Sequence, residues 1–94
     1  MGKSTIKNVL TIAGVDPSGG AGVLADVKVM SALGTYACAV VAALTAQNTR
    51  TVSAVLPVPA DFVAKQLETL FEDVSIDAVK IGMLSSPACM RAVA

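Results

Sequence analysis

Apolar residues in this chain form two kinds of pattern, short continuous blocks and stripes with helical spacing. Three continuous blocks, at 8–13, 36–44 and 78–83, have the length of buried strands. Strands that are apolar on both sides are typical of parallel sheets whose two faces are covered. A further block at 52–58 contains two prolines near its end, which indicates an edge strand or the end of a strand.

Two stretches between these blocks repeat apolar residues every three or four positions, which predicts helices over 20–33 and 61–74. The stripes consist of Val23, Val27, Met30 and Leu33 in the first helix and Val63, Leu67, Leu70, Phe71 and Val74 in the second. Gly34 follows the first stripe, where a glycine commonly ends a helix. Ser86 and Pro87 are typical of an N-cap and first turn, so we expect a third helix to begin there.

The order strand, helix, strand, strand, helix, strand predicts an α/β fold with a mostly parallel sheet between layers of helices. Three or four strands and two complete helices leave such a sheet partly uncovered. Hydrophobic residues make up 54% of the 94 residues and charged residues only 15%. A domain of this size does not easily bury that composition. We therefore expect either a homodimer or a portion of a larger domain.

Charge and residue types argue against several classes of protein. Seven basic residues balance seven acidic ones and aromatic residues are scarce, so no nucleic-acid partner is expected. Without histidine or a CxxC pair, no zinc site is expected, and Cys38 and Cys89 are interpreted as free thiols of a cytoplasmic protein. The uncharged run 29–49 is long enough to cross a membrane, but its continuous apolar part, 37–44, has strand length, so no membrane partner is expected.

The glycine-rich segment 14–22, GVDPSGGAG, joins the first strand to the first helix. A Walker A loop is not expected, because the GKST sequence at 2–5 has neither a strand nor a glycine before it. Residues 20–25 match the G-x-G-x-x-A fingerprint of dinucleotide-binding folds. However, no acidic residue ends the second strand to bind a ribose, which disfavours that interpretation.

A third interpretation of this segment is a site for a small polar ligand. Consecutive glycines let a ligand approach the backbone and leave amide N–H groups free to donate. Asp26 lies one helical turn beyond Gly22, and Gln47 and Asn48 follow the neighbouring strand, at the edge where α/β sheets bind ligands. A carboxamide facing a carboxylate suits a flat heterocycle with ring nitrogens and an amino group. Alternatively, Asp26 is a solvated helix residue and Gln47 a loop residue.

Three segments together carry a family resemblance: TIAGVDPSGGAGVLADVK, SALGTYACAVVAALTAQNT and DAVKIGMLSSP. They resemble the hydroxymethylpyrimidine/phosphomethylpyrimidine kinases of thiamine biosynthesis, in the ribokinase-like superfamily and near the pyridoxal kinases. The resemblance runs from about Val9 to Ala94. It implies a ribokinase-like three-layer sandwich, of which residues 1–94 form the N-terminal portion of a single domain. It also implies transfer of phosphate from ATP, with Mg²⁺, to 4-amino-5-hydroxymethyl-2-methylpyrimidine and then to its monophosphate.

The same resemblance implies a pyrimidine pocket made by Gly14, Ala21, Asp26, Gln47 and Met83. Gln47 is expected to bind the edge of the ring, and the Met83 thioether to pack near its face. The nucleotide site and the catalytic base are expected downstream of Ala94, so no catalytic, cofactor or metal residue is assigned within the chain. The chain alone is expected to be inactive. A pyridoxal or pyridoxine kinase and an inactive ligand-binding module stay open as alternatives.

Overall fold

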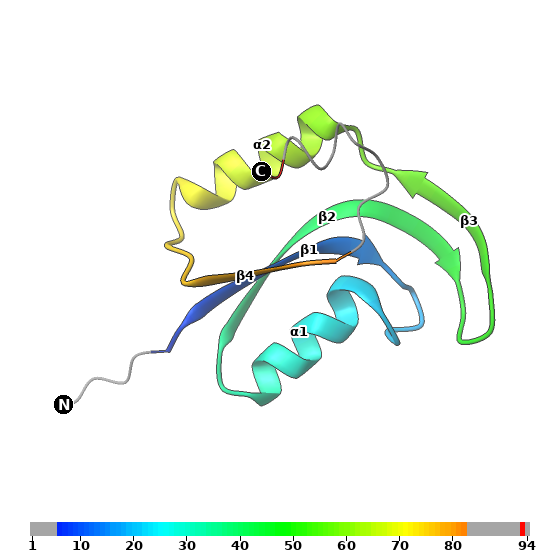
Figure 1. Ribbon diagram of the computed structural model, residues 1–94, viewed down its shortest axis with the longest axis horizontal. Helices are drawn as coiled ribbons and strands as arrows, with labels where there is room; N and C mark the ends of the chain where they lie inside the picture. The colour runs from blue at the N-terminus through cyan, green and yellow to red at the C-terminus, as the bar shows by residue number, and fades with distance from the viewer. Residues whose placement is uncertain (1–5, 83–92, 94) are drawn as a thin grey trace.

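A four-stranded sheet lies between two helices in the computed structural model of the protein, which describes residues 6–82 and 93 (Figure 1). In chain order the elements are β1 (Asn8–Val15), α1 (Gly22–Ala32), β2 (Tyr36–Gln47), β3 (Val52–Pro57), α2 (Ala60–Phe71) and β4 (Ala78–Ile81). The strands are arranged in the order β3-β2-β1-β4. β1 is parallel to β2 and β4, whereas β3 is antiparallel to β2. The predicted α/β class and the mostly parallel sheet are confirmed.

Alternate residues of β1 face the two helices, which lie on opposite sides of the sheet in Figure 1. On the side of α2, the buried core consists of Leu10, Ile12, Val40, Ala42, Val63 and Leu67. On the side of α1, the fully buried Thr11 contacts Asp26 of that helix. β1 is therefore buried on both faces, as its continuous apolar block predicted.

Three predicted boundaries were wrong, all near the carboxyl ends of β1 and β2. β1 continues to Val15, α1 begins at Gly22 instead of Gly20, and β2 continues to Gln47. Residues 45–47, predicted as part of a polar loop, belong to β2 because β3 folds back and pairs with them as far as Val52. Backbone pairing with a neighbouring strand here overrides the polarity of the side chains.

The end of α1 agrees more closely with the sequence, whereas the end of α2 does not. Gly34 has a positive φ of 83° directly after α1, as predicted, and the Thr35 N–H donates to the Met30 carbonyl oxygen at 3.1 Å. α2 ends at Phe71, three residues before the predicted end. β4 ends at Ile81, one residue before Gly82 of the strand expected at 78–83. Met83, the last residue of that expected strand, and the start of the helix expected at Ser86 lie outside the described residues.

Both edge strands leave apolar side chains uncovered. Every residue of β3 and of β4 is exposed, and the large apolar side chains among them are Val52, Val55, Leu56, Val79 and Ile81. Part of the apolar excess noted in the sequence is therefore found on the surface of these strands. Neither of the two described helices has the length and apolar character needed to cross a membrane.

Candidate functional site

A cavity of about 590 Å³ opens where β1 and β2 end and α1 begins. It is lined by Ala13, Gly14, Asp16, Ala21, Gly22, Asp26, Ala43, Thr45, Gln47, Val52, Val55, Lys80 and Gly82. Four of the five predicted site residues, Gly14, Ala21, Asp26 and Gln47, thus surround one space. Met83, the fifth, lies outside the described residues. Ligand binding by these residues stays a prediction.

The two strands beside the cavity are irregular at the positions that line it. The register between β1 and β2 shifts between Ala13 and Gly14, and that between β2 and β3 shifts between Ala46 and Gln47. Bulges of this kind bend a strand and redirect its side chains, and they are common beside functional sites. Residues of β1, β2 and β3 near these two shifts line the same space.

Asp16 organises the glycine-rich loop from within. Its Oδ1 accepts hydrogen bonds from the Ser18 N–H at 2.9 Å and the Ser18 hydroxyl at 2.7 Å, and its Oδ2 accepts from the Gly20 N–H at 3.1 Å. The Gly19 N–H donates to the Asp16 carbonyl oxygen at 2.9 Å. The Ser18 hydroxyl and the loop amides hold the pKa of the Asp16 carboxyl below its ordinary value.

These bonds correct one expectation about the loop. The consecutive glycines were expected to leave their amides free for a ligand, but the amides of Gly19 and Gly20 bind Asp16, as does that of Ser18. A carboxylate of the chain itself fills the concave row of N–H groups that an external anion would otherwise occupy. The loop is therefore a rigid wall of the cavity, and these three amides do not form a phosphate site.

Gly22 brings the start of α1 into direct contact with the end of β1. It has a φ of +66°, and a Cβ atom built on it would overlap the Gly14 carbonyl oxygen. Both the left-handed backbone and the close approach require glycine at this position. The contact places Ala21 and Asp26 beside Gly14 at the cavity.

Asp26 is held by two other elements of the fold. Its Oδ1 lies 2.7 Å from Lys80 Nζ of β4, and its Oδ2 accepts a hydrogen bond from the Thr11 hydroxyl of β1 at 2.6 Å. The Lys80 ammonium group, and to a smaller extent the Thr11 hydroxyl, keep the pKa of the Asp26 carboxyl below its ordinary value. Asp26 is therefore an ionised carboxylate in an ion pair, and the interpretation of a solvated helix residue was wrong.

Gln47 lies across the cavity from α1, at the end of β2. The Thr45 hydroxyl donates its one proton to the Val15 carbonyl oxygen at 2.7 Å, and the end of the Gln47 side-chain amide lies 3.1 Å from the same hydroxyl oxygen. Gln47 is a strand residue and not the loop residue of the alternative interpretation, and its side-chain amide carries both donors and an acceptor toward the cavity that it lines.

Sequence reasoning missed Thr11, Asp16 and Lys80. A signal existed for Lys80, because it is the one charged residue of the apolar block 78–83, and a charge within such a block needs a partner. No local pattern identifies Asp26 as that partner. Among the described residues no three potential metal ligands gather, so we assign no metal site there.

Comparison with known proteins adds sequence and structural matches. Residues 16–94 match the profile of a family described as phosphomethylpyrimidine kinase. Over 87 residues the chain is 59% identical to the hydroxymethylpyrimidine/phosphomethylpyrimidine kinase of Escherichia coli (strain K12), covering 93% of this chain and 33% of that protein. The chain thus spans about a third of the length of the first curated relatives it matches.

Two solved structures have the same arrangement of sheet and helices. The phosphomethylpyrimidine kinase of Clostridium difficile 630 matches with a TM-score of 0.88 and 50% identity, over 93% of this chain and 38% of that one. The pyridoxal kinase of Staphylococcus aureus, in complex with AMP-PCP and pyridoxal, matches with a TM-score of 0.84 and 40% identity, over 96% of this chain and 34% of that one. These matches confirm the predicted ribokinase-like fold.

Proposed function

Because this chain belongs to the phosphomethylpyrimidine kinase family, we propose that it forms the substrate side of a kinase in thiamine biosynthesis. The kinase transfers the γ-phosphoryl group of ATP to 4-amino-5-hydroxymethyl-2-methylpyrimidine and then phosphorylates the monophosphate. Residues 1–94 supply the pyrimidine pocket as the N-terminal portion of a single ribokinase-like domain. The nucleotide, its Mg²⁺ and the catalytic base are bound or supplied by residues downstream.

One observation carries this proposal: Asp26 and Gln47, 21 positions apart in the numbering, line the same cavity from α1 and β2. The Asp26 carboxylate can accept a hydrogen bond from the exocyclic amino group of the pyrimidine. The Gln47 amide can donate to a ring nitrogen and accept from an amino group at once. Apolar side chains of Val52 and Val55 line the same space and suit the faces of a flat ring.

The described residues bind and orient the substrate in this proposal. Phosphoryl transfer depends on positioning and on stabilising the charge of the transferred group. Asp26, Gln47 and the loop held by Asp16 contribute to positioning, since all three line the cavity. ATP and Mg²⁺ supply the phosphoryl group and its charge neutralisation, and we assign them no ligand among the described residues.

Replacing Gln47 by alanine in the full-length protein tests the proposal. The Thr45 hydroxyl keeps its bond to the Val15 carbonyl oxygen, so we expect Gln47→Ala to fold normally. An unpaired polar edge in a closed pocket costs about 1–3 kcal/mol, which corresponds to a roughly tenfold to hundredfold loss in the use of the pyrimidine. Steady-state kinetics should show this loss with the Michaelis constant for ATP unchanged.

The matched control is Thr49→Ala, in the exposed hairpin turn after Gln47. It should change the kinetics of neither substrate. If Gln47→Ala retains both the Michaelis constant and the turnover of the pyrimidine, Gln47 does not belong to the site. Absence of any pyrimidine phosphorylation by the wild-type protein would refute the proposed activity.

A pyridoxal kinase is the second candidate, favoured by the 40% identity to the Staphylococcus aureus enzyme. Pyridoxal is also a flat nitrogen heterocycle with a hydroxymethyl group, so Gln47 and Asp26 fit either ring. Competition between the two substrates for phosphorylation by the full-length protein distinguishes the candidates. The preferred substrate is the one with the higher kcat/KM. Binding of either ring without ATP turnover would instead indicate a ligand-binding module.

A further inference from the structure

Lys80 lies on an exposed edge strand, yet its ammonium group contacts the largely buried Asp26 carboxylate of α1. It stands directly opposite Thr11 in the parallel pairing of β4 with β1. Both side chains reach Asp26 of α1, Lys80 through Nζ at 2.7 Å and Thr11 through its hydroxyl at 2.6 Å. The carboxylate therefore joins two strands and a helix at the wall of the cavity.

The Asp26 carboxylate has one strong donor on each oxygen. Its side chain is 13% exposed, whereas that of Lys80 is 56% exposed. A carboxylate that is largely withdrawn from water needs such donors to keep its charge. Each oxygen retains a further lone pair, so the two bonds orient the carboxylate without preventing it from accepting from a ligand.

We propose that Lys80 is a positioning residue of the ring-binding cavity. Its ammonium group holds the Asp26 carboxylate charged and oriented toward the substrate, together with the Thr11 hydroxyl. Lys80 itself is not a catalytic residue, because it acts through Asp26. This inference rests on the proposed function of the site.

Other groups around the cavity leave this role to Lys80. Of the charged side chains that line it within the described residues, Asp16 and Asp26 are acidic and Lys80 is basic. Asp16 is already bonded to the loop amides, and the polar side chains that β2 contributes to the cavity, Thr45 and Gln47, are uncharged. Lys80 is therefore the cation that balances Asp26 in this part of the chain.

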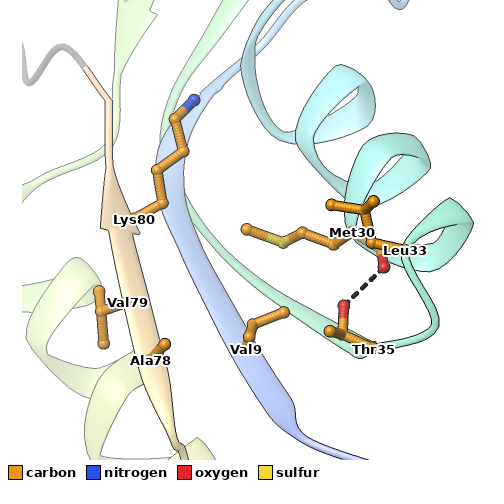
Figure 2. Close-up of a pocket in the computed structure, with 7 residues that line it drawn as sticks. All are labelled: Val9, Met30, Leu33, Thr35, Ala78, Val79 and Lys80. Atoms are coloured by element: carbon orange, nitrogen blue, oxygen red, sulfur yellow. Dashed lines mark hydrogen bonds between the residues drawn. The ribbon is translucent and has the colours of Figure 1, made fainter.

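The surroundings of the Lys80 stem suggest a variant that removes only the charge. Lys80 also lines a second cavity of about 210 Å³, whose lining includes Val9, Met30 and Leu33 (Figure 2). Methionine has an unbranched apolar side chain that suits this lining. Lys80→Met should therefore keep the packing beside β1 and lose the ion pair, while Lys80→Arg keeps a positive charge.

The test compares Lys80→Met, Lys80→Arg and the control Lys65→Met in the full-length protein. Lys65 is exposed on α2, which covers the opposite face of the sheet. Titration of the Asp26 carboxyl carbon by NMR should give a higher pKa in Lys80→Met than in the wild type. The Michaelis constant of the pyrimidine should rise roughly tenfold with that of ATP unchanged. The acid side of its pH profile should move to higher pH.

Lys80→Arg should keep the acid side of the pH profile where the wild type has it, and Lys65→Met should behave as the wild type. An unchanged Asp26 titration, or an unchanged pyrimidine Michaelis constant in folded Lys80→Met, overturns the inference. Lys80→Gln, which lacks the charge but keeps a donor, replaces Lys80→Met if that variant does not fold. The experiment separates failure of this inference from failure of the proposed function. If the wild-type protein does not phosphorylate the pyrimidine, the NMR titration still shows whether Lys80 holds the Asp26 carboxylate.

Discussion

Asp16 and Asp26 line the same cavity, but their hydrogen bonds give them different parts in it. Both oxygens of Asp16 bind groups of its own loop, Ser18 and Gly20, so Asp16 shapes the wall. Asp26 binds groups from β1 and β4, Thr11 and Lys80, and keeps lone pairs for a ligand. The partners of a carboxylate, more than its position in a motif, decide whether it shapes a site or contacts a substrate.

Replacing Asp16 by asparagine should open the loop. The variant has the same shape, but its amide nitrogen would face the Gly20 N–H, and two donors repel. We expect lower stability at neutral pH, measured by urea unfolding of the full-length protein, and faster exchange of the Ser18 and Gly20 amides. Asp73→Asn, an exposed acidic residue after α2, is the control and should change neither.

The lowered pKa of Asp16 also predicts how the stability of the protein depends on pH. The pKa of Asp16 is lowered in the folded state from its ordinary value of 3.8, so the unfolded chain binds its proton at higher pH. The stabilisation is complete above 3.8 and is lost as the pH falls through the lower, folded pKa. Asp16→Asn should therefore flatten the acid dependence of the unfolding free energy. An unaltered acid dependence would contradict this account.

At the level of elements, β2 depends on a side chain of α2 to complete its edge. β3 pairs with β2 only from Ala43 onward, which leaves the earlier part of that edge without a strand. Gln66 of α2 accepts from the Val41 N–H at 3.0 Å and donates to the Val41 carbonyl oxygen at 2.9 Å. A side-chain amide thus takes the place of a neighbouring backbone and ties the helix to the sheet.

Gln66→Ala should lower the unfolding free energy by about 1–3 kcal/mol, because it leaves two part-buried backbone groups of Val41 without partners. Urea unfolding measures the loss, and hydrogen exchange should show weaker protection of the Val41 amide. Thr69→Ala, one turn away on the exposed side of α2, is the control. Unchanged protection of Val41 together with unchanged stability would show that Gln66 is dispensable.

At the level of the whole molecule, the described sheet has two exposed edges with apolar side chains. β3 and β4 are exposed along their full length and carry Val55, Leu56 and Ile81, among others. Unpaired strand edges and apolar patches of this kind favour association with another polypeptide. Either a further portion of the same protein or a second copy in a homodimer would cover them, and both stay predictions.

Residues 1–94 produced alone should therefore self-associate and should show no pyrimidine-dependent release of ADP. The first expectation follows from the exposed edges, and the second from the proposal that the nucleotide site lies downstream. Light scattering after size-exclusion chromatography and a coupled ADP assay provide the measurements, with the full-length protein as the active reference. Measurable pyrimidine-dependent turnover by residues 1–94 would contradict the proposal that the nucleotide site lies outside these residues.

Local patterns were enough to predict the element order, the α/β class and the glycine that ends α1. Side-chain periodicity and the backbone freedom of glycine act within a few residues, so one sequence reveals them. The grouping of Asp26 and Gln47 also followed, because the ends of parallel neighbouring strands meet at one edge of a sheet, and the family resemblance added Gly14 and Ala21.

Contacts between distant segments decided the rest. β2 extends to Gln47 because β3 pairs with it, and no pattern within residues 45–47 reports that pairing. The sequence alone showed Lys80 as a charge in an apolar strand, but its partner Asp26 lies 54 positions away. Only the packing of α1 against β1, together with the pairing of β4 with β1, brings the two together, since ion pairs depend on distances in space and not on separation along the chain.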